Sequence, residues 1–233
     1  MLLNYIKILF VILLFYQTTV HSKINKNSEF NSKDLSNYFS ALLSSNNQKN
    51  FKALEHFSLS KSLINTHDPY LKNYINSLVI EGQVQTAINE LKFNLDKENS
   101  NFFESYLLLT IDSIKKKNFE RSKNYLNKLS NFKENGTFEL IIYETIKNYV
   151  YLFENKKIFT KNSSLGNLEI INRAFESCYL GEKNTNVYFL NLINSNDLNY
   201  SRYIFFYINY LIEQNRYKEI YEVSEQIDIL NTN

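Results

Sequence analysis

Residues 69–96 read PYLKNYINSLVIEGQVQTAINELKFNLD, and this stretch decides the fold. It contains two segments with apolar residues at helical spacing, and Gly82 lies between them. A glycine at this point suits the left-handed backbone conformation that often closes a helix. The opening proline is tolerated in a first helical turn. The stretch therefore predicts a helix-turn-helix unit, with helices over about 69–81 and 84–96.

The second helix of this unit recurs along the chain. In each copy, small or apolar residues stand at i, i+4 and i+7, which places them on one stripe of a helix. The five triplets are Ala53/Phe57/Ser60, Ala87/Leu91/Asn94, Ser122/Leu126/Leu129, Asn186/Leu190/Ile193 and Ile220/Ser224/Ile227. The first residues of successive triplets are separated by one repeat of about 34 residues. The exception is the interval from Ser122 to Asn186, which is nearly two repeats long. A period in this range predicts stacked helical hairpins, an architecture that presents a surface.

The same pattern predicts six hairpins from Asp34 onward, and Asp34 is a reasonable N-cap for the first helix. The predicted helix pairs are 35–45 with 51–64, 69–81 with 84–96, 101–117 with 119–129, 138–155 with 158–165, 168–180 with 185–193, and 200–214 with 217–229. The fourth pair is degraded, because the interval from Ser122 to Asn186 is shorter than two full repeats. We therefore expect its second helix, near 158–165, to be short.

The composition favours a folded helical chain. Hydrophobic residues make up 44% and aromatic residues 15% of the 233 residues, which is enough to fill a core. The chain has four glycines and one proline, which are too few turn-forming residues for an all-β domain. The net charge is +2 with both signs interspersed, so we expect no nucleic-acid partner. The basic run Lys115-Lys116-Lys117 is interpreted as a solvated helix end, with a phosphate site as the alternative.

Residues 1–22 form a separate module. Lys7 lies in a short n-region, and residues 8–16 are an apolar run of the length of a signal-peptide core. Small or β-branched residues at 20–22 suit cleavage after residue 22. The alternative is an uncleaved membrane anchor, although the apolar run is shorter than the roughly 20 residues that a spanning helix prefers. Both interpretations place the rest of the chain outside the cytoplasm, with residues 23–33 as a flexible approach.

The sequence offers little material for catalysis. It contains three histidines, one of them in the leader, and no Gly-rich phosphate loop, HExxH or Gly-x-Ser-x-Gly motif. His56 is interpreted as a half-exposed helix residue rather than a metal ligand. The single cysteine, Cys178, is interpreted as a small buried hydrophobe rather than a reactive thiol. We therefore expect a protein that is not an enzyme and that has no cofactor and no metal site.

The units share a small residue near the eighth position, a polar or glycine turn near the fifteenth, an aromatic residue near the seventeenth and a small residue near the twentieth. This order resembles the tetratricopeptide repeat (TPR), and residues 104–129 and 202–229 resemble it fairly well. The best match, residues 69–96, holds Leu78, Gly82, Val84, Ala87 and Leu91. The chain departs from the TPR pattern in that its units have no tryptophan and no regularly placed proline. The positions that are small in the pattern are often Ser, Asn or Ile here. With the leader, the arrangement also resembles exported repeat proteins of AT-rich bacteria.

The resemblance implies an all-α fold, a right-handed α-solenoid of stacked helix-turn-helix repeats. Residues 34–131 would hold three TPR-like hairpins, and residues 132–233 degenerate and terminal ones. In such solenoids the first helices of successive repeats line a concave groove. In that register Lys72 and Asn76 would point into the groove, a pair that resembles half of the clamp by which some members hold a terminal carboxylate. The next repeat has Leu107 and Ile111 at these places, so we expect an apolar groove floor there, or simply core.

The aromatic segment at 200–210 is the other candidate binding surface, because aromatic residues with a polar tip are frequent in interfaces. Arg202 and Asn209 would flank it. The alternative is a helix that its neighbours bury on both sides.

These observations predict a non-catalytic protein–protein interaction scaffold in an extracytoplasmic compartment, the bacterial periplasm. Its candidate binding residues are Lys72, Asn76, Arg202 and Asn209, and its partner is a protein or peptide. The alternative is a membrane-anchored structural or assembly subunit of the cell envelope that faces the periplasm. In both cases only residues 1–22 would meet the membrane, and only if they are not cleaved.

Overall fold

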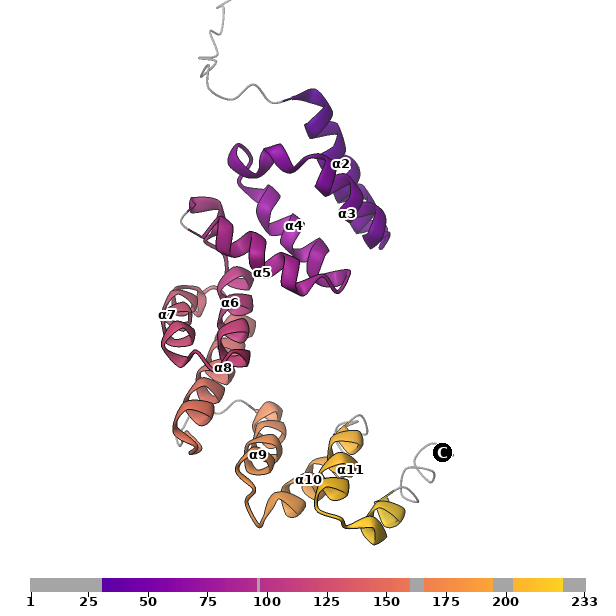
Figure 1. Cartoon of the computed structure of the whole chain (residues 1–233), viewed down its shortest axis with the longest axis vertical. Coiled ribbons are helices and arrows are strands. Elements are labelled where there is room, and N and C mark those ends of the chain that lie inside the picture. Colours follow the sequence, from indigo (N-terminus) through magenta and orange to yellow (C-terminus); the bar gives the residue numbers. More distant parts are fainter. Residues whose placement is uncertain (1–30, 96, 160–165, 195–202, 224–233) are drawn as a thin grey trace, which may run out of the picture. The chain divides into compact units, whose positions relative to one another are not determined.

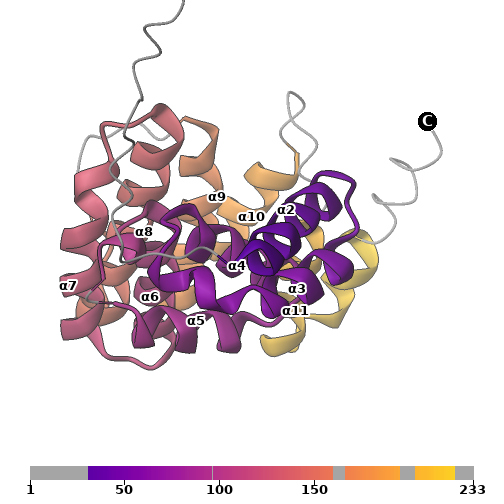
Figure 2. The same cartoon turned by 90° about the horizontal axis from the view of Figure 1, so that it is seen from above.

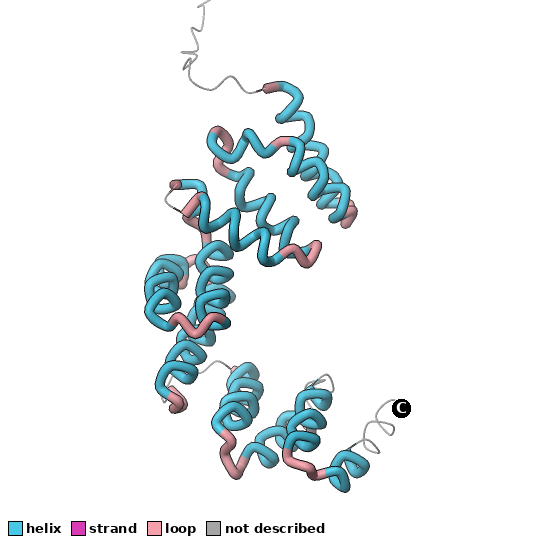
Figure 3. The backbone as a smooth tube through the Cα atoms, viewed as in Figure 1, coloured by secondary structure: helices cyan, strands magenta, loops and turns pink. Residues whose placement is uncertain are grey.

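The computed structural model describes residues 31–95, 97–159, 166–194 and 203–223. All regular structure in these ranges is helical (Figures 1 and 3), so the predicted all-α class is confirmed. The chain separates into two compact units, Met1–Ser77 and Leu78–Asn233.

Unit 1 contains a helical hairpin. Its helices are α2 (Ser32–Asn46) and α3 (Asn50–Leu59), followed by the 3₁₀ helix η1 (Lys61–Asn65) and the start of α4 (Pro69–Ile80). α4 begins at the residue predicted for it, and α2 packs on α3 and η1. The N-cap of α2 is Asn31 and not Asp34, because α2 begins earlier than predicted: the Asn31 Oδ1 accepts from the Lys33 N–H at 2.9 Å.

The core of unit 1 is aromatic. Phe57 of α3 is fully buried, and its ring centroid lies 6.0 Å from that of Tyr38 and 6.0 Å from that of Tyr70. Tyr74 completes the group at 6.5 Å from Phe57. The Tyr70 hydroxyl donates to the Phe57 carbonyl, so the polar end of this buried ring is satisfied.

Unit 2 contains the remaining helices. They are α5 (Val84–Phe93), η2 (Glu98–Ser100), α6 (Phe103–Lys115), α7 (Phe119–Leu129), η3 (Ser130–Phe132), α8 (Thr137–Asn155), α9 (Asn167–Leu180), α10 (Thr185–Ile193) and α11 (Ile204–Glu213). Helical residues continue at 217–223. Helices adjacent in sequence pack together: α5 on α6, α6 on α7, α7 on α8, α9 on α10, and α10 on α11. Figures 1 and 2 both show α6, α7 and α8 side by side.

Five hairpin turns in the described ranges have the same backbone. One or two positions beyond the first helix, a residue adopts a left-handed conformation, and the N–H of the next residue donates to the carbonyl at i−5. The left-handed residues are Gln48, Gly82, Lys117, Gly181 and Asn215, with φ between +56° and +73°. This is the bonding of a Schellman motif. The numbers of these five residues increase in the same steps as those of the triplets, so the period of the sequence is also a period of the backbone.

Replacing Lys117 by glycine is expected to raise the free energy of unfolding by about 1 kcal/mol. A left-handed conformation strains any residue with a Cβ, and Lys117 is exposed, so little contact is lost. Lys115→Gly is the matched control: it lies in the last turn of α6, where glycine costs about 1 kcal/mol. Urea denaturation measures both, and a loss of stability in Lys117→Gly would contradict the assigned turn.

The predicted buried stripes are confirmed in the first three second helices. The triplets that begin at Ala53, Ala87 and Ser122 are all buried. In α10, however, the buried residues are Thr185, Phe189 and Leu192, so the predicted stripe was wrong by one position. The large Phe189 side chain is fully buried, and its packing sets the phase of α10. The corrected stripe keeps the period, because the buried Val223 follows Phe189 by one repeat of about 34 residues.

Ser122→Ala is expected to stabilise the chain by about 1 kcal/mol. The Ser122 hydroxyl is fully buried and has no hydrogen-bond partner, and Ala53 and Ala87 occupy the equivalent places in α3 and α5. Ser113→Ala is the control, since that buried hydroxyl donates to the Leu109 carbonyl at 2.8 Å. Thermal denaturation of both variants should show a gain for Ser122→Ala only.

Some of the other predicted helices lie partly outside the described residues. Ile158 and Phe159, at the start of the predicted short helix, are not helical; residues 160–165 lie outside the described ranges. The Phe159 ring instead packs on α8, with its centroid 5.0 Å from that of Tyr151. The leader at 1–22 and residues 200–202 and 224–229 of the last predicted pair also lie outside.

Candidate functional site

The predicted groove residues of unit 1 lie on the outward stripe of α4. Lys72 is exposed and Asn76 is half-buried, one helical turn apart on the same helix. The opposite side of α4 carries the buried residues Tyr70 and Tyr74. The spacing inferred from the sequence therefore puts an ammonium group and an amide on one face.

The aromatic segment of unit 2 is divided between two faces of α11. Ile204, Tyr207 and Leu211 are buried in the core of the last hairpins. The opposite stripe carries Phe205, 74% exposed, with Asn209 and Ile212 one and two turns further on, both exposed. Asn209 thus stands within an apolar exposed stripe, so α11 is not buried on both sides. Arg202, its predicted companion, lies outside the described residues.

The corresponding face of α6 is also apolar. Ile111 is 44% exposed, and Leu107 and Ile114 are half-buried beside it. The sequence left open whether these residues form a groove floor or core, and their burial is intermediate between the two.

A charged network joins α5 to the C-terminal end of α6 in unit 2. The Asp112 carboxylate on α6 is buried, with its side chain 4% exposed. Its Oδ2 accepts from the Lys92 Nζ at 2.6 Å and from the Lys116 Nζ at 2.9 Å, and its Oδ1 lies 2.7 Å from the Lys116 Nζ. Burial acts to raise the pKa of Asp112, but the hydrogen bonds from Lys116 and Lys92 outweigh it and hold the pKa below its ordinary value. The hydrogen bond to Asp112 raises the pKa of Lys116.

This network explains the basic run at the end of α6. Lys115 and Lys117 are exposed, as expected for a solvated helix end, but Lys116 is paired with the buried carboxylate. The i, i+4 spacing of Asp112 and Lys116 was a signal in the sequence for half of this arrangement. Nothing local indicated Lys92, which comes from another helix.

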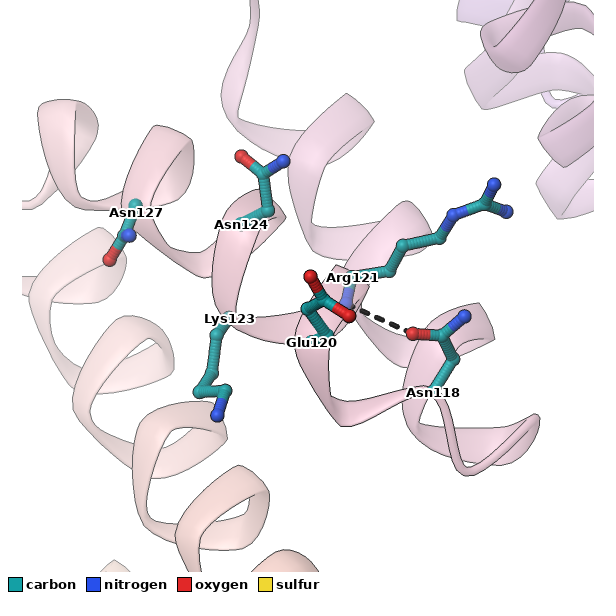
Figure 4. A pocket seen from close by; sticks show the side chains of 6 residues that line it. All are labelled: Asn118, Glu120, Arg121, Lys123, Asn124 and Asn127. Carbon is teal, nitrogen blue, oxygen red and sulfur yellow. Dashed lines mark hydrogen bonds between the residues drawn. The ribbon is translucent and has the colours of Figure 1, made fainter.

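A small hollow lies on this network. Its volume is about 110 Å³, and its lining consists of Lys92, Asp112, Ser113, Lys116, Asn118, Arg121 and Tyr125. Asn118 is the N-cap of α7, and its Oδ1 accepts from the Arg121 N–H at 3.0 Å. Figure 4 shows this bond and shows the side chains of Arg121 and Lys123 leaving α7 in opposite directions. Lys123, which lines a shallow polar surface with Glu120 and Asn127, pairs with Glu154 at 2.7 Å.

The interface between α8 and α9 contains a polar contact that the sequence did not predict. The Tyr149 hydroxyl donates to the Asn172 Oδ1 at 3.1 Å, and Glu176 lies one turn further along α9, buried. Burial raises the pKa of Tyr149 to about 12, and Glu176 adds to that rise. The pKa of Glu176 is raised by burial and by Glu182 and Glu169, against the opposing effect of Arg173.

Glu176→Gln is expected to stabilise the chain by about 1 kcal/mol at pH 7, because it removes a buried charge. In the unfolded state the Glu176 carboxyl group loses its proton near its ordinary pKa of 4.5. Because the pKa is raised in the folded state, the folded chain still holds this proton at pH values just above 4.5. The stability of the natural chain therefore falls as the pH rises through this window, and the advantage of the variant should disappear below pH 4.5. Thermal denaturation from pH 3.5 to 7 measures this, with Glu134→Gln in the exposed turn before α8 as the control.

The remaining sequence candidates show no catalytic grouping. His56 is half-buried, and its Nδ1 has no hydrogen-bond partner. Cys178 is half-buried against the core of the last hairpins, and burial and then Glu213 raise the pKa of its thiol, so the reactive thiolate is disfavoured. Across the described ranges, no three His, Cys, Asp or Glu side chains gather as metal ligands would. Within the same ranges, no helix has the length and apolar character needed to span a bilayer.

Comparisons with known proteins return no similarity. The sequence matches no family model, and no curated protein and no solved structure matches it.

Proposed function

We propose that this chain is a protein-interaction scaffold: a right-handed α-solenoid of TPR-like hairpins that binds a protein or peptide and catalyses no reaction. The observation that carries the proposal is the recurrence of one hairpin turn at the period of the sequence, from Gln48 to Asn215. A repeated hairpin that packs on its sequence neighbours is a unit of a quasi-one-dimensional fold, and such folds serve mainly to present extended surfaces.

The exposed stripes of the first helices support a binding role. On α4 the stripe carries Lys72 and Asn76, and on α11 it carries Phe205, Asn209 and Ile212. Large exposed apolar side chains that alternate with polar ones are typical of protein-binding surfaces. In the proposed register each stripe belongs to the groove face of its own unit, where an ammonium group or an amide would bind the backbone or carboxylates of a peptide.

The test is peptide selection against residues 23–233, followed by paired charge reversals. Lys72→Glu is expected to weaken the binding of those selected peptides that are acidic about tenfold, which equals about 1.4 kcal/mol. Lys52→Glu, which reverses an exposed charge on the second helix α3, should change their affinity less than about twofold. Ile111→Asp tests the apolar stripe in the same way. Equal affinities of all three variants and the natural chain would contradict groove binding.

Export is part of the proposal, and its alternative is a membrane-anchored structural subunit. The mass of the protein purified from its natural host distinguishes them. A chain that begins at Lys23 supports export and release, whereas a chain that retains Met1 in the membrane fraction supports the anchor.

A further inference from the structure

The hollow between α5, α6 and α7 has an excess of positive charge. Lys92, Lys116 and Arg121 line it, and among the described residues Asp112 is the only acidic one that does. Both oxygens of Asp112 are already bonded to the two lysines. No acidic side chain in the described part of the chain pairs with the Arg121 guanidinium. The hollow therefore carries two positive charges more than its own carboxylate can balance.

The two ammonium groups are held close together. Both donate to the same oxygen, Asp112 Oδ2, at 2.6 Å for Lys92 and 2.9 Å for Lys116. One carboxylate neutralises only one of these two charges, so the group of three side chains keeps a net charge of +1. A second anion on the open side of the pair would offset the rest.

The donors suit a tetrahedral oxyanion. A guanidinium offers a planar fork for two oxygens, and each ammonium group has donors left after its bond to Asp112. Asn118 adds an amide whose oxygen is engaged with the Arg121 N–H at 3.0 Å, which leaves its Nδ2 to donate. The volume of about 110 Å³ is several times the share of about 30 Å³ that one water takes in the liquid, so a small oxyanion fits.

We propose that this hollow binds a doubly charged oxyanion of the phosphate type. The charge excess of two matches a phosphate group better than a single carboxylate, and it disfavours any metal cation. The site is independent of the proposed groove, because its residues belong to the loop-proximal ends of α5, α6 and α7 and not to the exposed stripes of the first helices. Two sources share this chemistry: free inorganic phosphate and a phosphorylated side chain of a peptide.

The test titrates residues 23–233 with inorganic phosphate, with a phosphoserine peptide and with its unphosphorylated form, using calorimetry and backbone amide shifts. The expected result is saturable phosphate binding that shifts the amides of Asn118 and Arg121. Arg121→Gln should weaken it about tenfold. Lys115→Gln removes the same charge from the same hairpin but does not line the hollow, so it should change binding less than about twofold. Circular dichroism checks that both variants, which alter exposed side chains, remain folded.

The peptide arm distinguishes the two sources. The site binds phosphorylated side chains if the phosphopeptide binds at least about tenfold more tightly than free phosphate and if Arg121→Gln removes this difference in affinity. If it binds no more tightly than free phosphate, the ligand is the free ion. Absence of saturable binding in every arm would overturn the proposal. So would equal weakening by Arg121→Gln and Lys115→Gln, because that result indicates diffuse charge attraction.

Discussion

Phe57→Ala is expected to lower the free energy of unfolding by about 3–5 kcal/mol. Phe57 is 1% exposed, and it packs against the rings of Tyr38, Tyr70 and Tyr74 from the neighbouring helices. Alanine would leave a cavity that three aromatic rings cannot easily fill by relaxation, so both the transfer free energy and the packing of the ring are lost. Urea denaturation followed by far-ultraviolet circular dichroism measures the change.

Phe51→Ala provides the control for this prediction. Phe51 lies on the same helix, α3, but it is 74% exposed. Its removal should change the stability by less than about 0.5 kcal/mol. Similar losses for the two variants would mean that the aromatic core of unit 1 is wrongly assigned.

Phe189→Ala is expected to cost about 3–5 kcal/mol in the last hairpins of unit 2. The ring is fully buried, stacks on Tyr207 of α11 at a centroid distance of 5.4 Å and meets Phe175 of α9 edge-on at 5.8 Å. Phe189 is therefore a side chain through which α10 contacts helices on both sides. The matched control is Phe205→Ala, since Phe205 on α11 is 74% exposed and should contribute less than about 0.5 kcal/mol.

The location of this loss is as informative as its size. In a fold where each hairpin packs on its neighbours, a defect in α10 should destabilise α9–α11 and leave α6 and α7 largely protected. Amide hydrogen exchange measures protection helix by helix. Equal loss of protection throughout unit 2 would indicate a single cooperative core and would contradict the solenoid proposed here.

The positions of the candidate binding residues were predictable only in part. The helix faces of Lys72, Asn76 and Asn209 follow from spacing along one helix; in the structure Lys72 and Asn209 are exposed and Asn76 is half-buried, and their role in binding stays a prediction. Only part of the hollow near Asp112 was predictable from the sequence, namely the i, i+4 pair of Asp112 and Lys116. Lys92 and Arg121 come from other helices, and no local pattern connects them with Asp112.

Several helix bounds and turns were predictable from the local sequence. The bounds of α7 and α10, the start of α4 at Pro69 and the left-handed turns at Gly82 and Gly181 all agree with the pattern of residues. These features depend on contacts between close neighbours in sequence: capping, i, i+4 spacing and the backbone freedom of glycine.

Tertiary packing decided the rest. The buried stripe of α10 follows Phe189 and not Leu190, because the largest side chain takes the space that α9 and α11 leave. The polar contact of Tyr149 with Asn172 and the buried carboxylates of Asp112 and Glu176 likewise depend on which helix lies opposite. A residue's own neighbours in sequence decide whether it is helical, but the free energy of burying its side chain depends on groups distant in sequence, which only the folded chain brings together.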